Sequence, residues 1–292
     1  HAQRPADLWL MLGDNAYGAG TDSEYQAAVF DVYHPWLEQV PLWSCIGNHE
    51  TYGAAEDGKF AWDSIFEFPV NGECGGVASG TERYYSWNHA NIHFIALDSM
   101  TSSRAADGPM AQWLTADLQA NLQPWIIALW HHPPYTKGSH DSDFEEELVE
   151  MRENILPILE SHGVDLVLCG HSHCYERSWL LDGHYGDSSL FSPAYLLNDG
   201  DGRENGDGAY RKPAGPAVPR QGAVYVVAGS SGSAYEGTFD HPVHYAAMAE
   251  LGSLVIDVHD QRMDVLFLLD AETPQTPPVY ADYFTIIKGG PV

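Results

Sequence analysis

Four short polar clusters in the sequence carry the side-chain types that bind metal ions. They are GDNAY at 13–17, GNHE at 47–50, WHHPPY at 130–135 and GHSH at 170–173. Each cluster alone is a weak signal, because a Gly-Asp pair is often only a turn and an isolated buried histidine is usually a core residue. All four in this order, each directly after an apolar segment, predict a shared metal site instead.

Asp14 is the best candidate for a carboxylate that bridges two metal ions. Two cations about 3.5–4 Å apart need a shared anionic ligand that screens their repulsion. Tyr17 lies three residues further on and can return to the same centre, while Asn48 offers an amide oxygen. His171 and His173 are two residues apart, so in an extended segment their side chains point the same way. The spacing therefore predicts neighbouring metal sites.

Apolar strands are expected directly before the four clusters, at 7–12, 41–46, 124–130 and 165–169. A strand pair is expected over RYYSWN and NIHFIALD, and helices over about 22–38, 59–66, 110–122 and 143–162, with Gly163 as a helix stop. This alternation is typical of an open α/β sheet with its site at the carboxyl ends of the strands.

The second half of the sequence is rich in strands and poor in helix signals. The predicted strands are GAVYVVAG, SLVIDV, RMDVLFLL and YFTII, and they suggest a second sheet packed on the first. The sequence shows no internal repeat and no convincing boundary between domains. We therefore interpret residues 1–292 as one catalytic domain.

The composition is strongly acidic. Lys plus Arg number 13 against 41 Asp plus Glu, a formal net charge of -28, which argues against a nucleic-acid partner and against an anionic membrane surface. No apolar stretch approaches the roughly 20 residues needed to span a bilayer. Such a chain also repels phosphorylated substrates, so local positive charge for them must come from bound metal ions.

The four cysteines form no CxxC pair, which excludes a zinc ribbon or a thioredoxin-type motif. Cys45 and Cys169 end apolar runs and are interpreted as small core residues. A disulfide between Cys74 and Cys174 stays open at this stage.

The order GDxxY, GNHE, a strand ending in H-x-P-x-Y, and GHxH followed by YER resembles the calcineurin-like metallophosphoesterases. Tyr17 makes the pattern similar to their purple acid phosphatase branch. The resemblance covers residues 7–178 closely and the remainder more loosely. It implies an α/β fold, a four-layer αββα sandwich of two mixed sheets, here without its first strand.

The resemblance also implies a set of metal ligands. Asp14 would bridge two metal ions, and Tyr17 and His173 would bind the first, usually ferric iron. The second ion, a divalent zinc, manganese or iron, would be bound by three further residues: Asn48, His131 and His171.

Three more histidines have counterparts in the family. His49 and His140 match family histidines that hold the phosphate or protonate the leaving group. His132 occupies a variable family position, so it is interpreted as a neighbour and not as a ligand.

The function implied is hydrolysis of phosphate monoesters of small molecules by attack of a metal-bound hydroxide on phosphorus. Two alternatives stay open: a phosphodiesterase or nucleotidase with the same metal site, and a processed, non-catalytic fragment with a metal-binding or structural role. A secreted or periplasmic location is expected. The sequence leaves the oligomeric state open.

One family feature is missing from the sequence. The upstream Asp-x-Gly turn, which supplies a further carboxylate to the iron, does not occur. Asp7 is the only Asp before Asp14, and seven residues of extended strand would separate the two by roughly 23 Å. Because the chain starts at His1 without a Met, we expect an N-terminally truncated or processed domain.

Some polar residues outside the clusters have both a functional and a structural interpretation. The loop 198–208 could bind calcium but is better interpreted as a Gly-rich turn. Arg177 could touch substrate, although a structural salt bridge is favoured. His241 and His244 could line the substrate mouth, but a structural or exposed position is the first expectation.

Overall fold

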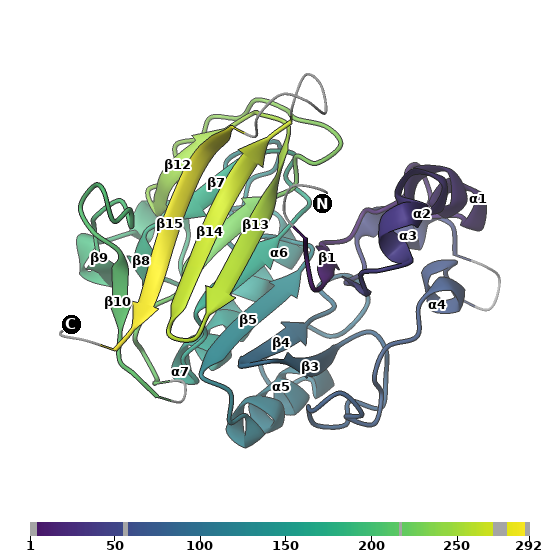
Figure 1. Ribbon diagram of the computed structural model, residues 1–292, viewed down its shortest axis with the longest axis horizontal. Coiled ribbons are helices and arrows are strands. Elements are labelled where there is room, and N and C mark those ends of the chain that lie inside the picture. The colour runs from purple at the N-terminus through teal and green to yellow at the C-terminus, as the bar shows by residue number, and fades with distance from the viewer. Residues whose placement is uncertain (1–4, 55–57, 216–217, 271–278, 290–292) are drawn as a thin grey trace.

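The computed structural model describes residues 5–54, 58–215, 218–270 and 279–289. Two large mixed sheets stack face to face, with the four-stranded sheet in front of the seven-stranded one in Figure 1. The mixed-sheet α/β class predicted from the sequence is therefore confirmed.

The seven-stranded sheet has the order β12-β7-β11-β6-β5-β4-β3. Strands β4, β5, β6 and β11 run parallel, whereas β3 and β7 run antiparallel to their neighbours. The bounds are β3 (Tyr85–His89), β4 (Ile92–Ala96), β5 (Trp125–Trp130), β6 (Leu166–Cys169), β7 (Tyr175–Ser178), β11 (Val224–Ala228) and β12 (His244–Met248).

The four-stranded sheet has the order β10-β15-β14-β13. Its strands are β10 (Tyr210–Lys212), β13 (Gly252–His259), β14 (Arg262–Leu269) and β15 (Tyr280–Lys288). The sequence assigned the segment GAVYVVAG to this second sheet, and that assignment is wrong. It forms β11, which pairs with β6 in the first sheet. Four of the five β11 residues are buried, as expected for an inner strand covered on both faces.

Alternate residues of β5 supply two separate apolar cores. Trp125 and Ile127 pack with residues of the four-stranded sheet such as Phe267. Ile126 and Ala128 belong to the second core, which includes residues of the helices on the other face. Because side chains alternate across a strand, one all-apolar segment can fill both layers.

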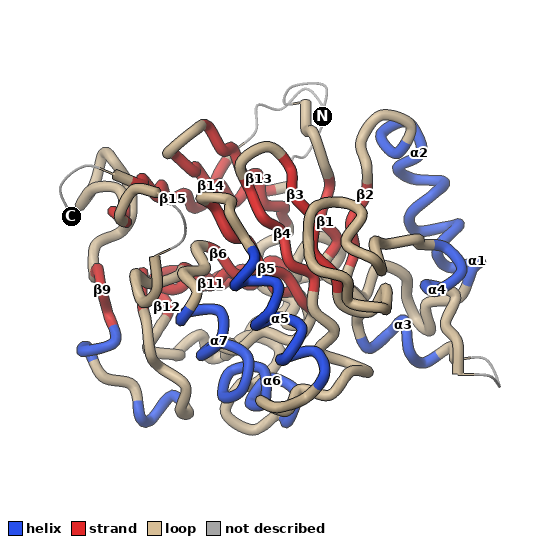
Figure 2. The backbone as a smooth tube through the Cα atoms, turned by 90° about the horizontal axis from the view of Figure 1, so that it is seen from below, coloured by secondary structure: helices blue, strands red, loops and turns tan. Residues whose placement is uncertain are grey.

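Helices cover the outer face of the seven-stranded sheet, as Figure 2 shows. They are α5 (Pro109–Ala120), α6 (Glu146–Glu150), the π-helix η2 (Met151–Ile155) and α7 (Leu156–Ser161). The predicted helices at 110–122 and 143–162 are thus present. Pro157 lacks the backbone N–H that a regular turn would use, and the π-helical turn lies directly before it.

The first two strands form a small sheet of their own. Strand β1 (Trp9–Met11) pairs in parallel with β2 (Leu42–Ser44) and with no strand of the seven-stranded sheet in the described chain. The prediction that all four cluster-bearing strands share one sheet is therefore wrong. One edge of β1 is bonded to β2, and the residues of β1 are only partly buried.

A group of helices lies beside this small sheet, on the right in Figure 1. It comprises α1 (Asp22–Tyr25), the π-helix η1 (Gln26–Phe30), α2 (Asp31–Leu37), α3 (Asn48–Tyr52) and α4 (Trp62–Ile65). The first three run on without a break, which matches the helix predicted at 22–38. Thr21 caps its start, because its side chain accepts from the N–H of Glu24.

The remaining elements are short: β8 (Leu180–Leu181), β9 (Leu196–Asn198) and the 3₁₀ turns η3 (Ser188–Leu190) and η4 (Pro193–Tyr195). Burial alternates along β14, so the front face of the four-stranded sheet points to solvent, and no described helix covers it in Figure 1. Across the described ranges, no helix is both long enough and apolar enough to cross a membrane.

Candidate metal centre

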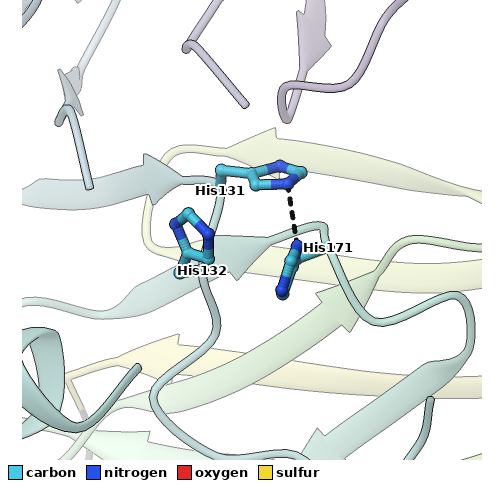
Figure 3. A group of neighbouring side chains, drawn as sticks. All are labelled: His131, His132 and His171. Carbon is cyan, nitrogen blue, oxygen red and sulfur yellow. Dashed lines mark hydrogen bonds between the residues drawn. The ribbon is translucent and has the colours of Figure 1, made fainter. Parts of the chain in front are cut away.

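The loops that follow β1, β2, β5 and β6 bring four predicted ligands together. The Nε2 atom of His131 lies 3.0 Å from Oδ1 of Asn48 and 3.2 Å from Oδ2 of Asp14. The Nδ1 atom of His171 lies 3.1 Å from both Asn48 Oδ1 and His131 Nε2. Figure 3 shows the rings of His131 and His171 joined by this contact.

The backbone at the site adopts conformations that ordinary residues avoid. Asp14 has φ 53° and His171 has φ 62°, both in the left-handed region. Gly13 (φ 84°) directly precedes Asp14, and a side chain at Gly47 would collide with the Asp14 carboxylate. Strain of this kind is concentrated at functional sites, where the surrounding structure over-determines it.

Glu50 holds the first two loops in place. Its buried carboxylate accepts hydrogen bonds from the N–H groups of Asp14 (2.7 Å), Asn15 (2.7 Å) and Gly47 (2.8 Å). The Tyr25 hydroxyl donates a fourth bond at 3.0 Å. A buried carboxylate with this many donors stabilises the geometry of the loops that carry Asp14 and Asn48.

The donor atoms of Asn48, His131 and His171 fit one metal ion, with Asp14 in contact with His131. The Nδ1 of His131 lies 2.8 Å from the carbonyl oxygen of Leu12, which fixes Nδ1 as the protonated nitrogen and leaves the Nε2 lone pair facing Asp14 and Asn48. Lone pairs then face one another, an arrangement that a cation stabilises. Ligands about 2.1 Å from a shared metal ion lie roughly 3.0–3.4 Å apart, as these atoms do.

The electrostatics of the site also favour a positive charge. Burial disfavours the protonated form of His131, yet the Asp14 carboxylate raises the pKa of this histidine above its ordinary value. Burial opposes ionisation of Asp14, but His131 and the hydrogen bond from the His49 N–H lower its pKa to about 2. Burial lowers the pKa of His171 to about 4, so its imidazole is neutral and able to bind a metal ion.

Tyr17 and His173 form a second group next to Asp14. The phenol oxygen of Tyr17 lies 3.0 Å from Nε2 of His173. Burial and the carboxylates of Asp14 and Glu50 raise the pKa of Tyr17 above its ordinary value. Asp14 therefore lies between His131 and the Tyr17–His173 pair.

His132 lies beside His131 and His171 in Figure 3, and its ring centroid is 4.4 Å from that of His171. Its Nδ1 is 2.9 Å from the Ser99 hydroxyl, and burial holds its pKa well below the ordinary value. These contacts fit a neutral neighbour.

His49 and His140 lie on the walls of the same cavity. Nδ1 of His49 donates to the carbonyl oxygen of Gly18 at 2.8 Å. Nδ1 of His140 donates to Glu145 at 2.8 Å, and the centroid of the His140 ring lies 3.7 Å from that of the His171 ring, with the two rings tilted by 31°. In both histidines Nδ1 takes part in a hydrogen bond, so Nε2 is the atom that can exchange a proton with a ligand.

The cavity has a volume of about 430 Å³ and holds most of the predicted site residues. Its described lining is Asp14, Asn48, His49, Tyr52, Met100, His132, His140, Glu145, Glu147, His171 and His173. No Lys or Arg occurs among these described lining residues. The positive charge that a phosphate needs is thus left to a cation bound by the donors.

A family model for calcineurin-like phosphoesterases matches residues 1–175, more than half of the chain. The chain belongs to the calcineurin-like phosphoesterase family. Members of this family are metal-dependent phosphoesterases, which implies a dinuclear metal centre.

Curated relatives in this family are purple acid phosphatases, so the predicted resemblance is confirmed. Purple acid phosphatase 15 of Arabidopsis thaliana is 33% identical over 68% of this chain and 40% of its own length. Acid phosphatase type 7 of Homo sapiens is 30% identical over 59% of this chain and 41% of its own length. The chain thus spans less than half the length of these relatives.

Solved structures share the family fold. A purple acid phosphatase from yellow lupin seeds superposes with a TM-score of 0.69 at 17% identity, covering 96% of this chain and 46% of its own. GAP50, described as the anchor in the inner membrane complex of Plasmodium, gives 0.54 at 11% identity, over 97% of this chain and 79% of its own. These likenesses concern the fold alone.

The sequence interpretation missed three carboxylates at this candidate site. Glu50 is the last residue of the GNHE motif, three residues after Gly47, and this capping spacing is a signal that could have revealed its role. Glu145 and Glu147 lie in an acidic stretch interpreted as helix, and no local pattern distinguishes them from Glu146.

Several secondary predictions have clear outcomes. Arg177 forms a buried salt bridge with Asp282 at 2.6 Å, which confirms the structural interpretation. The possibility that His241 and His244 line the substrate mouth is wrong, because both side chains are buried away from the described lining of the cavity. His241 packs against Tyr135, and His244 lies 3.4 Å from the Glu176 carboxylate.

The cysteine predictions can also be compared with the structure. Cys45 and Cys169 are buried core residues, as expected, and all four cysteines are free thiols. A Cys74–Cys174 disulfide is therefore excluded, since Cys74 is exposed and Cys174 is buried beside Ser172. In the loop 198–208, Asp201 accepts from the backbone N–H groups of Arg203 and Asp207, which fits the Gly-rich turn.

Proposed function

We propose that this chain is a binuclear-metal hydrolase that cleaves phosphate monoesters. The observation that carries the proposal is the donor set of Asp14, Asn48, His131 and His171, whose closest atoms lie 3.0–3.2 Å apart. In the proposal Asp14 bridges the two metal ions, and Asn48, His131 and His171 bind the divalent one. Residues 1–292 are treated as one catalytic domain.

The first ion is proposed to be ferric iron, bound by Asp14, Tyr17 and His173, with zinc, manganese or iron(II) as the second. A phenol oxygen 3.0 Å from an imidazole nitrogen and next to a carboxylate supports a hard trivalent ion. Iron-loaded protein is expected to absorb visible light through the Tyr17 phenolate, and the Tyr17→Phe variant is expected to lose that absorption. A colourless protein that contains iron would contradict the assignment.

When bound, the two cations would lower the pKa of a bound water and neutralise charge on the phosphoryl oxygens. The chain's own residues supply orientation and protons. His140 is held by Glu145 through Nδ1, so its Nε2 can give a proton to the leaving alcohol. His49 is held by Gly18 in the same manner and is proposed to contact the phosphate.

The test is hydrolysis of nitrophenyl phosphate against bis(nitrophenyl) phosphate by the metal-loaded protein. A preference for the monoester is expected, and Asp14→Asn is expected to abolish it because the shared carboxylate is removed. Asp7→Asn, an exposed carboxylate on the same segment, is the matched control. Preference for the bis-ester would instead indicate the phosphodiesterase or nucleotidase alternative. Metal-replete protein without turnover on either ester would indicate the non-catalytic alternative.

The proposal extends to partners and location. The substrate is a phosphorylated small molecule, since the cavity is small and the net charge of -28 disfavours nucleic acid. A secreted or periplasmic location is retained as part of the proposal, supported by the acidic composition. Fractionation of cells that express the natural gene tests it.

A further inference from the structure

The part of the cavity that lies beyond the candidate ligands has a distinct chemistry. Its remaining walls include Tyr52, Met100, Glu145 and Glu147. If the donor groups hold the phosphate through metal ions, the alcohol of the ester must lie against these walls. Their charge therefore decides which leaving groups the site accepts.

Glu147 has an unpaired carboxylate in this wall. Among the described residues, its side chain makes no hydrogen bond and no ion pair, and it is half-buried. Glu145 differs, because its carboxylate accepts from His140 at 2.8 Å and lies 3.5 Å from His171. Glu147 is thus the lining carboxylate that is free to pair with a positively charged ligand.

Two cationic side chains from segments next to the cavity are already paired with other carboxylates. Arg104, which is close enough to His132 to help lower its pKa, forms an ion pair with Glu150 at 2.8 Å. Lys137 follows the WHHPPY motif by two residues and is paired with Asp143 at 2.8 Å. Neither is free to offset the negative potential that Glu147 places in the cavity.

Tyr52 adds an aromatic surface to the same cavity. Its hydroxyl accepts from the Asn48 amide at 2.8 Å, and its ring packs edge-on against His49 with centroids 5.0 Å apart. The ring is held by these contacts while the residue is 62% exposed. An exposed aromatic ring near a carboxylate is a favourable place for an organic cation.

We propose that the cavity selects phosphate monoesters whose leaving alcohol carries a positive charge, such as amino alcohols, and that Glu147 sets this preference. The proposal rests on the proposed hydrolase function. In this proposal the metal ions bind the phosphate. The Glu147 carboxylate and Tyr52 contact the other end of the substrate.

The experiment uses three small monoesters that differ in the charge of the leaving group. Ethanolamine phosphate releases a cation, glycerol 3-phosphate a neutral alcohol and 3-phosphoglycerate an anion. At neutral pH we expect kcat/KM to fall in that order, by about tenfold from cation to anion, and the ratio to shrink as salt is added.

Glu147→Gln separates this inference from the proposed function. In this variant the ratio of kcat/KM between ethanolamine phosphate and 3-phosphoglycerate is expected to fall toward one. Glu146→Gln is the matched control, because Glu146 is the exposed neighbour and does not line the cavity. It is expected to keep the wild-type ratio.

Each other outcome has a definite meaning. Equal rates on the three esters, or a ratio that Glu147→Gln leaves unchanged, would overturn the selectivity and leave the hydrolase intact. Metal-loaded wild-type protein that hydrolyses none of the three esters, and no nitrophenyl ester either, would overturn the proposed function and the selectivity together.

Discussion

The protein contains two groups of clustered histidines, and they differ in what surrounds them. One group, with His131 and His171, meets the carboxylate of Asp14 and the amide of Asn48. The other contains His184, His241 and His244, buried around Tyr135 and beside aromatic rings. Clustering is common to both, so clustering alone does not make a metal site.

The ligand geometry separates the two groups. In the described chain, every group of three or more potential ligands with atoms within 4.8 Å of one another includes His171, and none includes His184. Neither ring nitrogen of His184 has a hydrogen-bond partner among the described residues, and its ring centroid lies 6.4 Å from that of His241. The second group is too widely spaced to share one ion.

The pKa values show the physical cause. Burial lowers the pKa of His184 to about 4 and that of His241 to about 2. At His131 burial acts in the same direction, but the Asp14 carboxylate outweighs it and raises the pKa. Burial opposes a positive charge on all of these histidines, and at His131 the close contact with the Asp14 carboxylate outweighs it.

The comparison predicts its largest effect in catalysis. His131→Ala is expected to lower kcat/KM on a phosphate monoester by about a thousandfold, since it removes a proposed ligand of the second metal ion. His184→Ala, in the second group, is expected to retain activity close to wild type in the fraction that folds. Equal losses in both variants, measured on folded protein, would remove the distinction between the groups.

A second effect concerns stability and the loops that carry Asp14 and Asn48, which have no counterpart around His184. Glu50→Ala leaves the buried N–H groups of Asp14, Asn15 and Gly47 without their acceptor. We expect a loss of about 3 kcal/mol in the free energy of unfolding, measured with urea. Glu24→Ala, which removes a carboxylate that caps the start of α1, is the control and should cost much less than Glu50→Ala. Comparable losses would show that Glu50 has no special role.

The smallest effect is a pH dependence of stability due to the second group. Above about pH 6.5 His184 is neutral in both states. Below that pH the unfolded chain binds a proton that the folded protein, with a pKa of about 4, does not bind. Stability therefore falls as the pH drops from about 6.5 to about 4.

His184→Phe tests this dependence, because Tyr135, Phe191 and Tyr195 already surround the ring and suit an aromatic replacement. Over the same pH range, the free energy of unfolding of the variant is expected to fall by about 2 kcal/mol less than that of the wild type. Thermal unfolding at several pH values gives the answer. Parallel pH profiles of the two proteins would show that His184 takes no part in acid destabilisation.

The meeting of the candidate ligands could be predicted because local sequence marks them. Asp14, Asn48, His131 and His171 each come just after an apolar run, and the ends of these runs meet in the fold. Motif order and strand ends are short-range features that a sequence displays directly.

Other features depend on distant pairing and could not be predicted. Whether β11 joins the first or second sheet depends on its register with Leu166, almost sixty residues earlier, and both choices suit an apolar strand. Glu147 faces the cavity while Glu146 is exposed, and this depends on how the loop before α6 enters the helix. Periodicity in the sequence does not determine that entry.

Metal analysis of the purified protein, paired with turnover on a phosphate monoester, tests the central claim most directly. The account predicts about two equivalents of metal per chain, including iron, with hydrolysis that a chelator removes and added metal restores. In His131→Ala we expect at most one equivalent, while His184→Ala keeps two. At most one equivalent in the wild-type protein, together with no turnover after metal is added, would contradict the account.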